Sequence, residues 1–212
     1  MTRLDTDAYQ PNPMFTHLKS LGHTPRFHGN GFVQLYVGEG KRLHIWSPRL
    51  PAIRDHNATL HNHRYDVHSE VLYGKLIHTI YSIIDDPRGK YQRNVVNTSN
   101  PEDKPLTGPE GTGQRVSLVD IGRYEMSAGS FYVFPYPFFH TSEARELTVT
   151  LFEQVNDDRS RHPVVISPFG KAPTHAFDPA TAPSEEVLWE VIHNVCRVCA
   201  HKIADCLFIG EK

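Results

Sequence analysis

The sequence lacks the long apolar runs that membrane insertion and secretion require. No hydrophobic run reaches the length of a transmembrane helix, and the first thirty residues contain no apolar core resembling that of a signal peptide. An excess of charge of one sign is also lacking, because 22 Lys and Arg residues stand against 24 Asp and Glu residues, for a net charge of -2. We therefore expect a cytoplasmic protein that needs neither a membrane nor a nucleic acid as partner.

Cysteine is scarce, and several familiar catalytic motifs are missing. The three cysteines, Cys196, Cys199 and Cys206, lie close together near the C-terminus, which is a poor disulfide framework and fits a reducing compartment. The sequence contains no GxSxG motif, no P-loop, and no GxGxxG that leads into a helix. It therefore carries no motif of a serine hydrolase, a P-loop nucleotide hydrolase or a dinucleotide-binding enzyme.

The central part of the chain, residues 31–170, reads as a single β domain. Short runs of β-branched and aromatic residues alternate there with Gly, Pro, Asn and Asp, and helical periodicity is almost absent. The runs are FVQLYV, RLHIW, SEVLY, KLIHTIYSII, QRVSLVDIG, SFYVF, LTVTLFEQV and HPVVIS. The first two flank a glycine-rich turn and predict a β-hairpin. We expect an all-β sandwich or barrel.

Three segments differ from this pattern. Residues 1–30 predict an N-terminal arm with a short helix around Pro13–Leu21, which Gly22 would end. Residues 85–115 are rich in Pro, Gly, Asn and charge, and predict a long loop, with a short strand at RNVV as an option. Such a loop is either a lid or a solvated insertion. Residues 171–212 predict a proline-rich linker and one helix.

The C-terminal helix has a clear start and a clear apolar stripe. Ser184 precedes two glutamates, which is the chemistry of a helix N-cap and an acidic first turn. The stripe consists of Val187, Leu188, Val191, Ile192, Val195, Val198 and Cys199. We expect this face to pack on the barrel or on another subunit. The Cys196-x-x-Cys199 pair could also form part of a zinc site, but its place in the stripe favours a packed helix.

Histidine is frequent, with fourteen residues, and two segments place it in a pattern. In HNHRYDVHSEVLYG, residues 61–74, His61 and His63 would project to the same face of a strand. In GSFYVFPYPFFH, residues 129–140, a strand follows a glycine, ends at prolines and leads to His140. Either segment alone could be a polar strand face, and the presence of the second strengthens the case that His61 and His63 bind a metal ion.

The two segments together resemble the two motifs of the cupin superfamily. The matching positions are His61, His63 and Gly74 in the first motif, and Gly129, Pro135 and His140 in the second, with Pro137 where the family usually has glycine. The resemblance spans roughly residues 43–155. It implies a cupin-type jelly-roll barrel (a double-stranded β-helix), with the N-terminal arm and the C-terminal helix outside it. It also implies metal ligation by the three histidines, and a homodimer.

The fourth ligand of the resemblance is not in its usual place. The position where the family carries an acid is Val67, which cannot bind a metal. His68 is the nearest residue that could, and we include it as a possible fourth ligand. Asp66 and Glu70 would need a bulge or a shifted register. If none of them binds, the site has three histidines. His44 and His78 lie within predicted strands and are expected in the core or along a pocket.

Three neutral imidazoles suit Fe(II), Mn(II), Ni(II), Cu(II) or Zn(II), and in a six-coordinate ion they leave positions for a substrate and dioxygen. Because such a set resembles the sites of mononuclear cupin oxygenases, we expect one Fe(II) per chain and an oxygenase that acts on a small organic molecule. Tyr73, Tyr81 and Tyr136 are candidates for an acid or hydrogen-bond donor. Two alternatives stay open: a metal-dependent isomerase or lyase, and a non-catalytic cupin that binds a small molecule.

Overall fold

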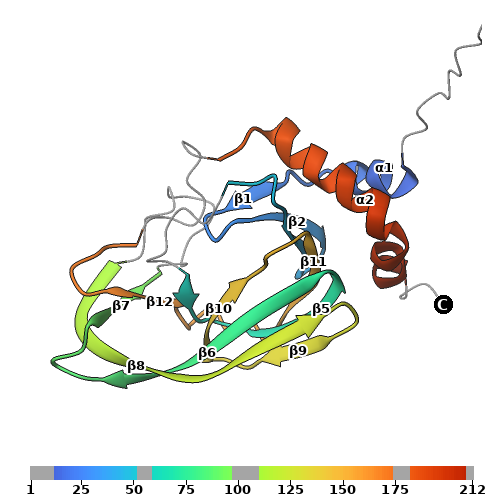
Figure 1. The fold of residues 1–212 in the computed structure, drawn as a ribbon. Coiled ribbons are helices and arrows are strands. Elements are labelled where there is room, and N and C mark those ends of the chain that lie inside the picture. Colours follow the sequence, from blue (N-terminus) through green and yellow to red (C-terminus); the bar gives the residue numbers. More distant parts are fainter. Residues whose placement is uncertain (1–11, 52–58, 97–109, 174–181, 209–212) are drawn as a thin grey trace, which may run out of the picture.

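The structure is a computed structural model that describes residues 12–51, 59–96, 110–173 and 182–208. Within these residues the chain is mostly β, with a barrel of antiparallel strands, a short N-terminal helix and one long C-terminal helix (Figure 1). The fold class predicted from the sequence is therefore confirmed. The start of the predicted N-terminal arm, residues 97–109 of the predicted loop and residues 174–181 of the predicted linker lie outside the described residues.

The first sheet has six antiparallel strands. In spatial order they are β1 (Arg26–His28), β2 (Phe32–Gly38), β3 (Lys41–Trp46), β11 (Thr148–Val155), β5 (Asp66–Tyr73) and β9 (Phe131–Phe134). The predicted hairpin is present, because β2 pairs with β3 across the turn at residues 39–40. Aromatic and aliphatic side chains from β2, β3, β5, β9 and β11 of this sheet lie in one buried cluster.

The second sheet closes on itself. Its strands, in order around the ring, are β10 (Phe139–Glu143), β4 (Leu60–His61), β12 (Val164–Pro168), β7 (Tyr91–Val95), β8 (Glu110–Ser127) and β6 (Lys75–Asp85). The segment 85–115 is therefore not one continuous loop, since β7 and the start of β8 fall within it. These strands form despite their polar composition because each pairs with neighbours on both sides, which satisfies the backbone groups.

The N-terminal helix α1 (Pro13–Ser20) forms where the sequence predicts it. The side chain of Asn12 caps it by accepting the backbone N–H groups of Met14 and Phe15, at 3.0 and 3.3 Å. Pro13 at the first position costs no hydrogen bond, because that N–H would have no partner within the helix. Met14 and Leu18 face inward and are buried, so the helix is held by its apolar side.

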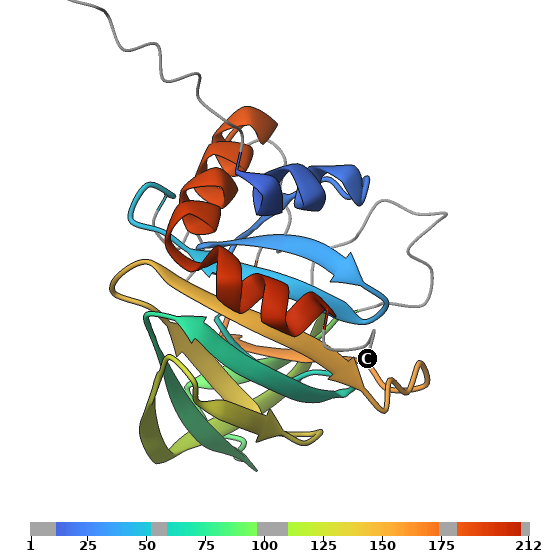
Figure 2. The ribbon, with the colours of Figure 1, turned by 90° about the vertical axis from the view of Figure 1, so that its right-hand side faces the viewer.

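The C-terminal helix α2 (Glu185–Phe208) lies over the outer face of the first sheet and bends near its middle (Figure 2). The bend is at Cys199, whose backbone is not helical. The side chains buried under the helix are Leu188, Val191, Ile192, Val195, Cys196, Cys199 and Ile203. The packed-helix expectation is confirmed, except that Val187 and Val198 of the predicted stripe are exposed. Within the described residues, none of the helices has the length and apolar character to span a membrane.

Strand β3 contributes side chains to two buried regions, one under α2 and one between the two sheets. Leu43 and Ile45 point outward and pack with α2, while the alternate residues point between the two sheets. The space between the sheets holds an aromatic-rich cluster made of Phe32, Trp46, Tyr65, Val67, Val71, Leu76, Ile80, Tyr132, Phe134 and Phe152. We call this region the inner core. The histidines of both sequence motifs lie at its edge.

Candidate metal centre

His61, His63 and His140 meet at one point between the two sheets. Each offers one ring nitrogen, and these three atoms lie within 4.8 Å of one another. The ring centroids are 4.8 Å apart for His61 and His63, 5.0 Å for His61 and His140, and 5.3 Å for His63 and His140. Among the described residues this is the one group of three or more metal-ligating side chains.

Strand pairing explains how residues about eighty positions apart come together. His61 in β4 is the direct partner of His140 in β10, so their side chains leave the sheet side by side. His63 lies beyond the end of β4, so only His61 is on the predicted strand, but its ring still meets that of His61. Asn62, between them, points the other way, and its side-chain oxygen accepts the backbone N–H of Val164 at 2.7 Å. This bond fixes the segment that carries both histidines.

The spacing of one pair of nitrogens fits a shared metal ion. The Nε2 atoms of His63 and His140 are 3.1 Å apart. Two imidazole nitrogens about 2.1 Å from one ion, with an angle of about 90° to 110° between them, are roughly 3.0 to 3.4 Å apart. The Nδ1 atom of His61 lies 2.9 Å from the carbonyl oxygen of Thr59, an acceptor that would leave its Nε2 free to bind. The hydroxyl oxygen of Ser142 lies 3.4 Å from Nδ1 of His140, a contact that would likewise leave Nε2 of His140 free to bind.

Burial keeps the three imidazoles neutral. Loss of contact with water lowers the pKa of His61, and lowers the pKa values of His63 and His140 well below the usual value. The guanidinium of Arg42 contributes to the lower pKa of His61 and of His63. A neutral imidazole has the lone pair that a metal needs, so the group is already in its binding form near pH 7.

The structure does not bring the predicted fourth ligand to this group. His68 lies on the outer face of β5, because Val67 and Ser69 on either side of it point inward, and its ring meets Phe131 edge to face. Glu70 shares that outer face and lies 3.9 Å from the sulfur of Cys206. Asp66 accepts the backbone N–H of Tyr136 at 2.8 Å. The arrangement is a three-histidine group.

The tyrosines predicted as acids or donors lie elsewhere. Tyr73 is 38% exposed, the ring of Tyr136 is covered by the guanidinium of Arg161, and Tyr81 belongs to a small cluster with Leu60 and Phe139. Phe139 and Leu60 are the neighbours of His140 and His61, so this cluster lies on the opposite face of the second sheet.

Two other tyrosines line the inner core. Tyr65 stacks on His63 with ring centroids 5.0 Å apart, and Tyr132 lies 4.6 Å from His78. Tyr65 could have been found from the sequence, because it continues the alternation of His61 and His63. Burial raises the pKa of Tyr132 to about 12, so this phenol stays protonated.

The inner core also contains buried polar side chains among its aromatic residues. His44 and His78 are buried there, in agreement with the expectation that they lie in the core or along a pocket. The Nε2 atom of each lacks a hydrogen-bond partner among the described residues. Ser142 lies 3.0 Å from Nδ1 of His78. Burial lowers the pKa of His78 to about 4. Arg42, next to His44 on the inward face of β3, was not predicted to have a role.

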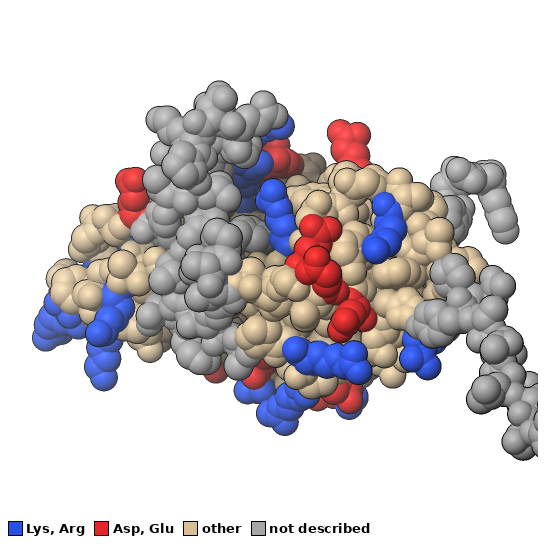
Figure 3. Space-filling model, turned by 90° about the horizontal axis from the view of Figure 1, so that it is seen from above, with Lys and Arg blue, Asp and Glu red and all other residues tan. Residues whose placement is uncertain are grey.

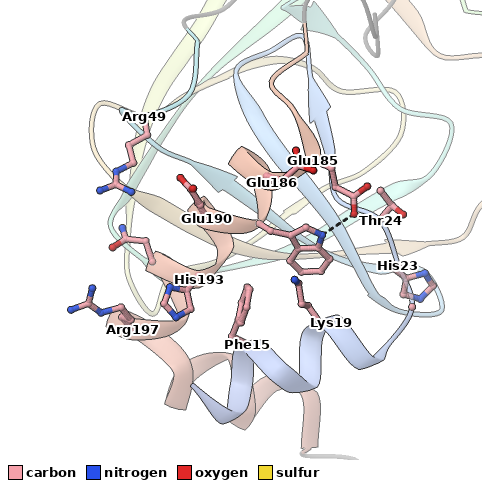
Figure 4. Close-up of a pocket in the computed structure, with 13 residues that line it drawn as sticks. Phe15, Lys19, His23, Thr24, Arg49, Glu185, Glu186, Glu190, His193 and Arg197 are labelled. Carbon is pink, nitrogen blue, oxygen red and sulfur yellow. Dashed lines mark hydrogen bonds between the residues drawn. The ribbon is translucent and has the colours of Figure 1, made fainter. Parts of the chain in front are cut away.

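A groove lies away from the three histidines, on the surface between α1 and α2 (Figure 4). This groove of about 850 Å³ has Trp189 and Phe15 on its floor, in edge-to-face contact at 5.9 Å. The ammonium of Lys19 lies 5.2 Å above the ring of Trp189, whose indole N–H donates to Glu185 at 2.9 Å. The groove holds no metal-ligating group of the kind formed by the three histidines.

The face that carries this groove is mixed in charge. Figure 3 shows acidic and basic side chains side by side on the surface seen from above.

The cysteines of α2 do not form a metal site either. Cys196 and Cys199 are buried among aliphatic residues, and burial raises their thiol pKa values to about 12 and about 11. The zinc alternative for this helix thus finds no support in the described residues.

No protein-family model matches the sequence, and no curated protein matches it significantly. Among solved structures, distant likenesses are found to a hydroquinone 1,2-dioxygenase from Sphingomonas sp. TTNP3 with 4-hydroxybenzoate bound, and to the hydroquinone 1,2-dioxygenase PnpCD in complex with Cd²⁺ and 4-hydroxybenzonitrile. The first has a TM-score of 0.29 and 10% identity over 57% of this chain and 63% of that chain. The second has a TM-score of 0.34 and 12% identity over 73% and 81%.

A third likeness is to ycfD of E. coli, with a TM-score of 0.31 and 11% identity over 79% of this chain and 43% of that chain. The chain thus spans less than two thirds of the length of the Sphingomonas enzyme and of ycfD. The topology itself is a closed ring of six antiparallel strands beside a six-stranded sheet. Because these likenesses are distant, the chemistry of the site has to follow from this chain's own side chains.

Proposed function

We propose that His61, His63 and His140 bind one divalent transition metal, and that the protein is a mononuclear non-haem Fe(II) oxygenase acting on a small organic molecule. The observation that carries the proposal is the convergence of three neutral imidazoles, that of His140 buried and those of His61 and His63 partly buried, from two distant segments onto one point. A carboxylate is not part of this group within the described residues, so the ligand set is neutral.

When bound, an Fe(II) ion held by three imidazoles would keep further coordination positions for a substrate and for dioxygen. The chain's own residues would prepare that place in two ways. The Thr59 carbonyl orients His61 through Nδ1, and Ser142 does so for His140. The rings of Phe134, 4.7 Å from His140, and of Phe152, 6.1 Å from His63, exclude water from the side that faces the inner core.

Metal content tests the site. Protein produced without a polyhistidine tag should contain about one iron per chain after anaerobic reconstitution, as measured by elemental analysis. His61→Ala and His140→Ala should reduce it to background, because each removes one of three ligands. His68→Ala is the matched control, since that residue lies on the outer face of β5, and it should keep the metal. Unchanged iron in the first two variants would refute the site.

Nitric oxide tests the reaction class, because it binds Fe(II) where dioxygen would. The reconstituted protein should give the electron paramagnetic resonance signal of a high-spin iron–nitrosyl adduct, and His68→Ala should give the same signal. A protein that holds iron but gives no adduct has no open position for dioxygen. That result would favour a metal-dependent isomerase or lyase, whereas loss of both metal and adduct would favour a non-catalytic binding protein.

A further inference from the structure

Arg42 is a buried cation that has no anionic partner among the described residues. Its residue exposure is 8%, and none of the six ion pairs among the described residues includes it. One terminal nitrogen donates to the hydroxyl of Tyr65 at 2.9 Å and the other to the hydroxyl of Tyr36 at 3.5 Å, while Nε has no partner in the described part of the chain. A charge buried without a counter-ion is costly, so its presence calls for an explanation other than stability.

The guanidinium lies one side-chain layer from the three histidines. Tyr65, which accepts its hydrogen bond, is stacked on the ring of His63. The Cζ atom of Arg42 is 4.2 Å from the ring centroid of Phe152, and the Phe152 ring also contacts His63. Its positive charge is close enough to contribute to the lower pKa of His63. Arg42 and the histidine group therefore face the same interior from opposite sheets.

The described side chains around Arg42 include hydrogen-bond donors but no carboxylate bonded to them. Arg42, His44 and Trp46 alternate along β3 and share its inward face. The indole N–H of Trp46 and Nε2 of His44 are buried, and neither finds a hydrogen-bond partner in the segments that the structure describes. The cross-strand neighbours Tyr36 and Phe152 add a hydroxyl and an apolar ring. Within the described residues, no carboxylate forms a hydrogen bond or ion pair with any member of this inward row.

We propose that Arg42 binds the carboxylate of the substrate, so that the enzyme acts on small organic acids whose reacting end lies at the three histidines. The substrate would supply the missing counter-ion. A guanidinium matches a carboxylate because its planar N–H groups can donate in parallel to both oxygens, and Nε is the unpartnered member of that pair here. The Trp46 indole can donate only, which also suits an anion. The inference rests on the proposed function, since it places the rest of the substrate at the metal.

Benzoate and benzamide are suitable probes, because they have nearly the same shape and differ in charge. Calorimetric titration of the metal-stripped protein measures their binding without relying on turnover. Wild type should bind benzoate at least tenfold more tightly than benzamide. In Arg42→Met this preference should vanish, with at least a tenfold loss for benzoate. Arg123→Met, which removes an exposed arginine paired with Glu143, is the matched control and should retain the preference.

A second variant covers the case in which Arg42→Met does not fold. Arg42→Lys keeps the charge but loses the parallel pair of donors, so benzoate should bind more weakly than in wild type and still better than benzamide. Equal binding of benzoate and benzamide by wild type would overturn the proposal, as would wild-type affinity in both variants. Tighter binding of inorganic phosphate than of benzoate would overturn the carboxylate assignment.

The two proposals can fail separately. If the protein holds no metal but discriminates benzoate from benzamide through Arg42, the oxygenase proposal fails and an anion site stands. If it holds one iron at the three histidines but does not discriminate the probes, the carboxylate inference fails alone.

Discussion

The carboxylate of Asp66 accepts the backbone N–H of Tyr136, seventy residues further along the chain, at 2.8 Å. Its second oxygen accepts the side-chain N–H of Asn156, also at 2.8 Å. Asp66 thereby connects the start of β5 to the turn between β9 and β10 and to the end of β11. Because His140 follows that turn, an aspartate that could be mistaken for a metal ligand instead helps to place one.

Asp66→Ala should destabilise the protein by about 1 kcal/mol, since it removes two hydrogen bonds of a partly exposed carboxylate. The loss would be measured by urea unfolding at pH 7. Asp120→Ala, an exposed position on β8, is the control and should change stability by less than about 0.5 kcal/mol. An equal loss in both variants would contradict the role given to Asp66.

The effect of Asp66→Ala should also depend on pH. The hydrogen bond from Asn156 and that from the Tyr136 backbone hold the pKa of Asp66 below its usual 3.8. A carboxyl group whose pKa is lower in the folded state stabilises the fold above its unfolded pKa and loses that contribution as the pH falls through the folded pKa. The difference from wild type should thus be constant between pH 5 and 7 and shrink below about pH 4. A difference that grows on acidification would contradict this.

Gly74 and Gly129 should respond differently to alanine, although both have positive φ angles, of 75° and 87°. At Gly74 an added Cβ would collide with the carbonyl oxygen of Leu147, whereas at Gly129 it meets nothing within 4 Å. Gly129→Ala should therefore cost only the backbone strain of about 1–2 kcal/mol. Gly74→Ala should cost about 3 kcal/mol or more, which includes displacement of the neighbouring strand. Thermal unfolding of both variants checks this order.

The packing of α2 on the first sheet can be tested with two aliphatic residues of that helix. Ile192 is fully buried, and Ile192→Ala should cost about 2–5 kcal/mol because it leaves a cavity. Val198, 41% exposed, should lose less than about 0.5 kcal/mol on change to alanine. Chemical denaturation gives both values. A large effect at Val198 in dilute solution would indicate that another surface covers it.

Thiol labelling should separate the three cysteines. Burial raises the pKa values of Cys196 and Cys199, so each remains a neutral thiol and out of reach of a reagent at pH 8. Cys206 is only partly buried, and it should react slowly, because burial and the nearby Glu70 raise its pKa too. Dithionitrobenzoate should therefore label one thiol in the folded protein and three in denaturant. Rapid labelling of all three would contradict the packing of α2.

The fold was largely predictable from the sequence because most of its strands are long and bounded by turn residues. The strands that escaped prediction are β1 and β10, of three and five residues, which are too short for alternation to show clearly. The strand expected to carry His61 and His63 is β4, which has only two residues and ends at His61. The start of β8 was assigned to a loop because its composition is polar, and within the same loop β7 overlaps the short strand that was considered at RNVV. They are strands because their partners in the ring satisfy the backbone, and pairing over that distance leaves no local trace.

The candidate site was predictable where spacing along the chain determines position. His61 and His63 were found from their alternation, and His140 from its place after the prolines. Counting residues from His63 pointed to His68. The count ignores that the chain passes from β4 in the second sheet to β5 in the first sheet, where the side chain of His68 lies on the outer face. Arg42 was missed because a single arginine in an alternating strand looks solvated until the second sheet closes over it.

Strand β3 is shared by two parts of the molecule, and this limits how the protein can change during evolution or design. Its odd-numbered residues Leu43 and Ile45 support α2, and its even-numbered residues Arg42 and His44 face the inner core. Either set can be substituted one residue at a time. An insertion or deletion of one residue within the strand would exchange the two sets, putting a guanidinium under the helix and leucine beside the histidines. Natural variants of this strand should therefore differ by substitution and keep its length.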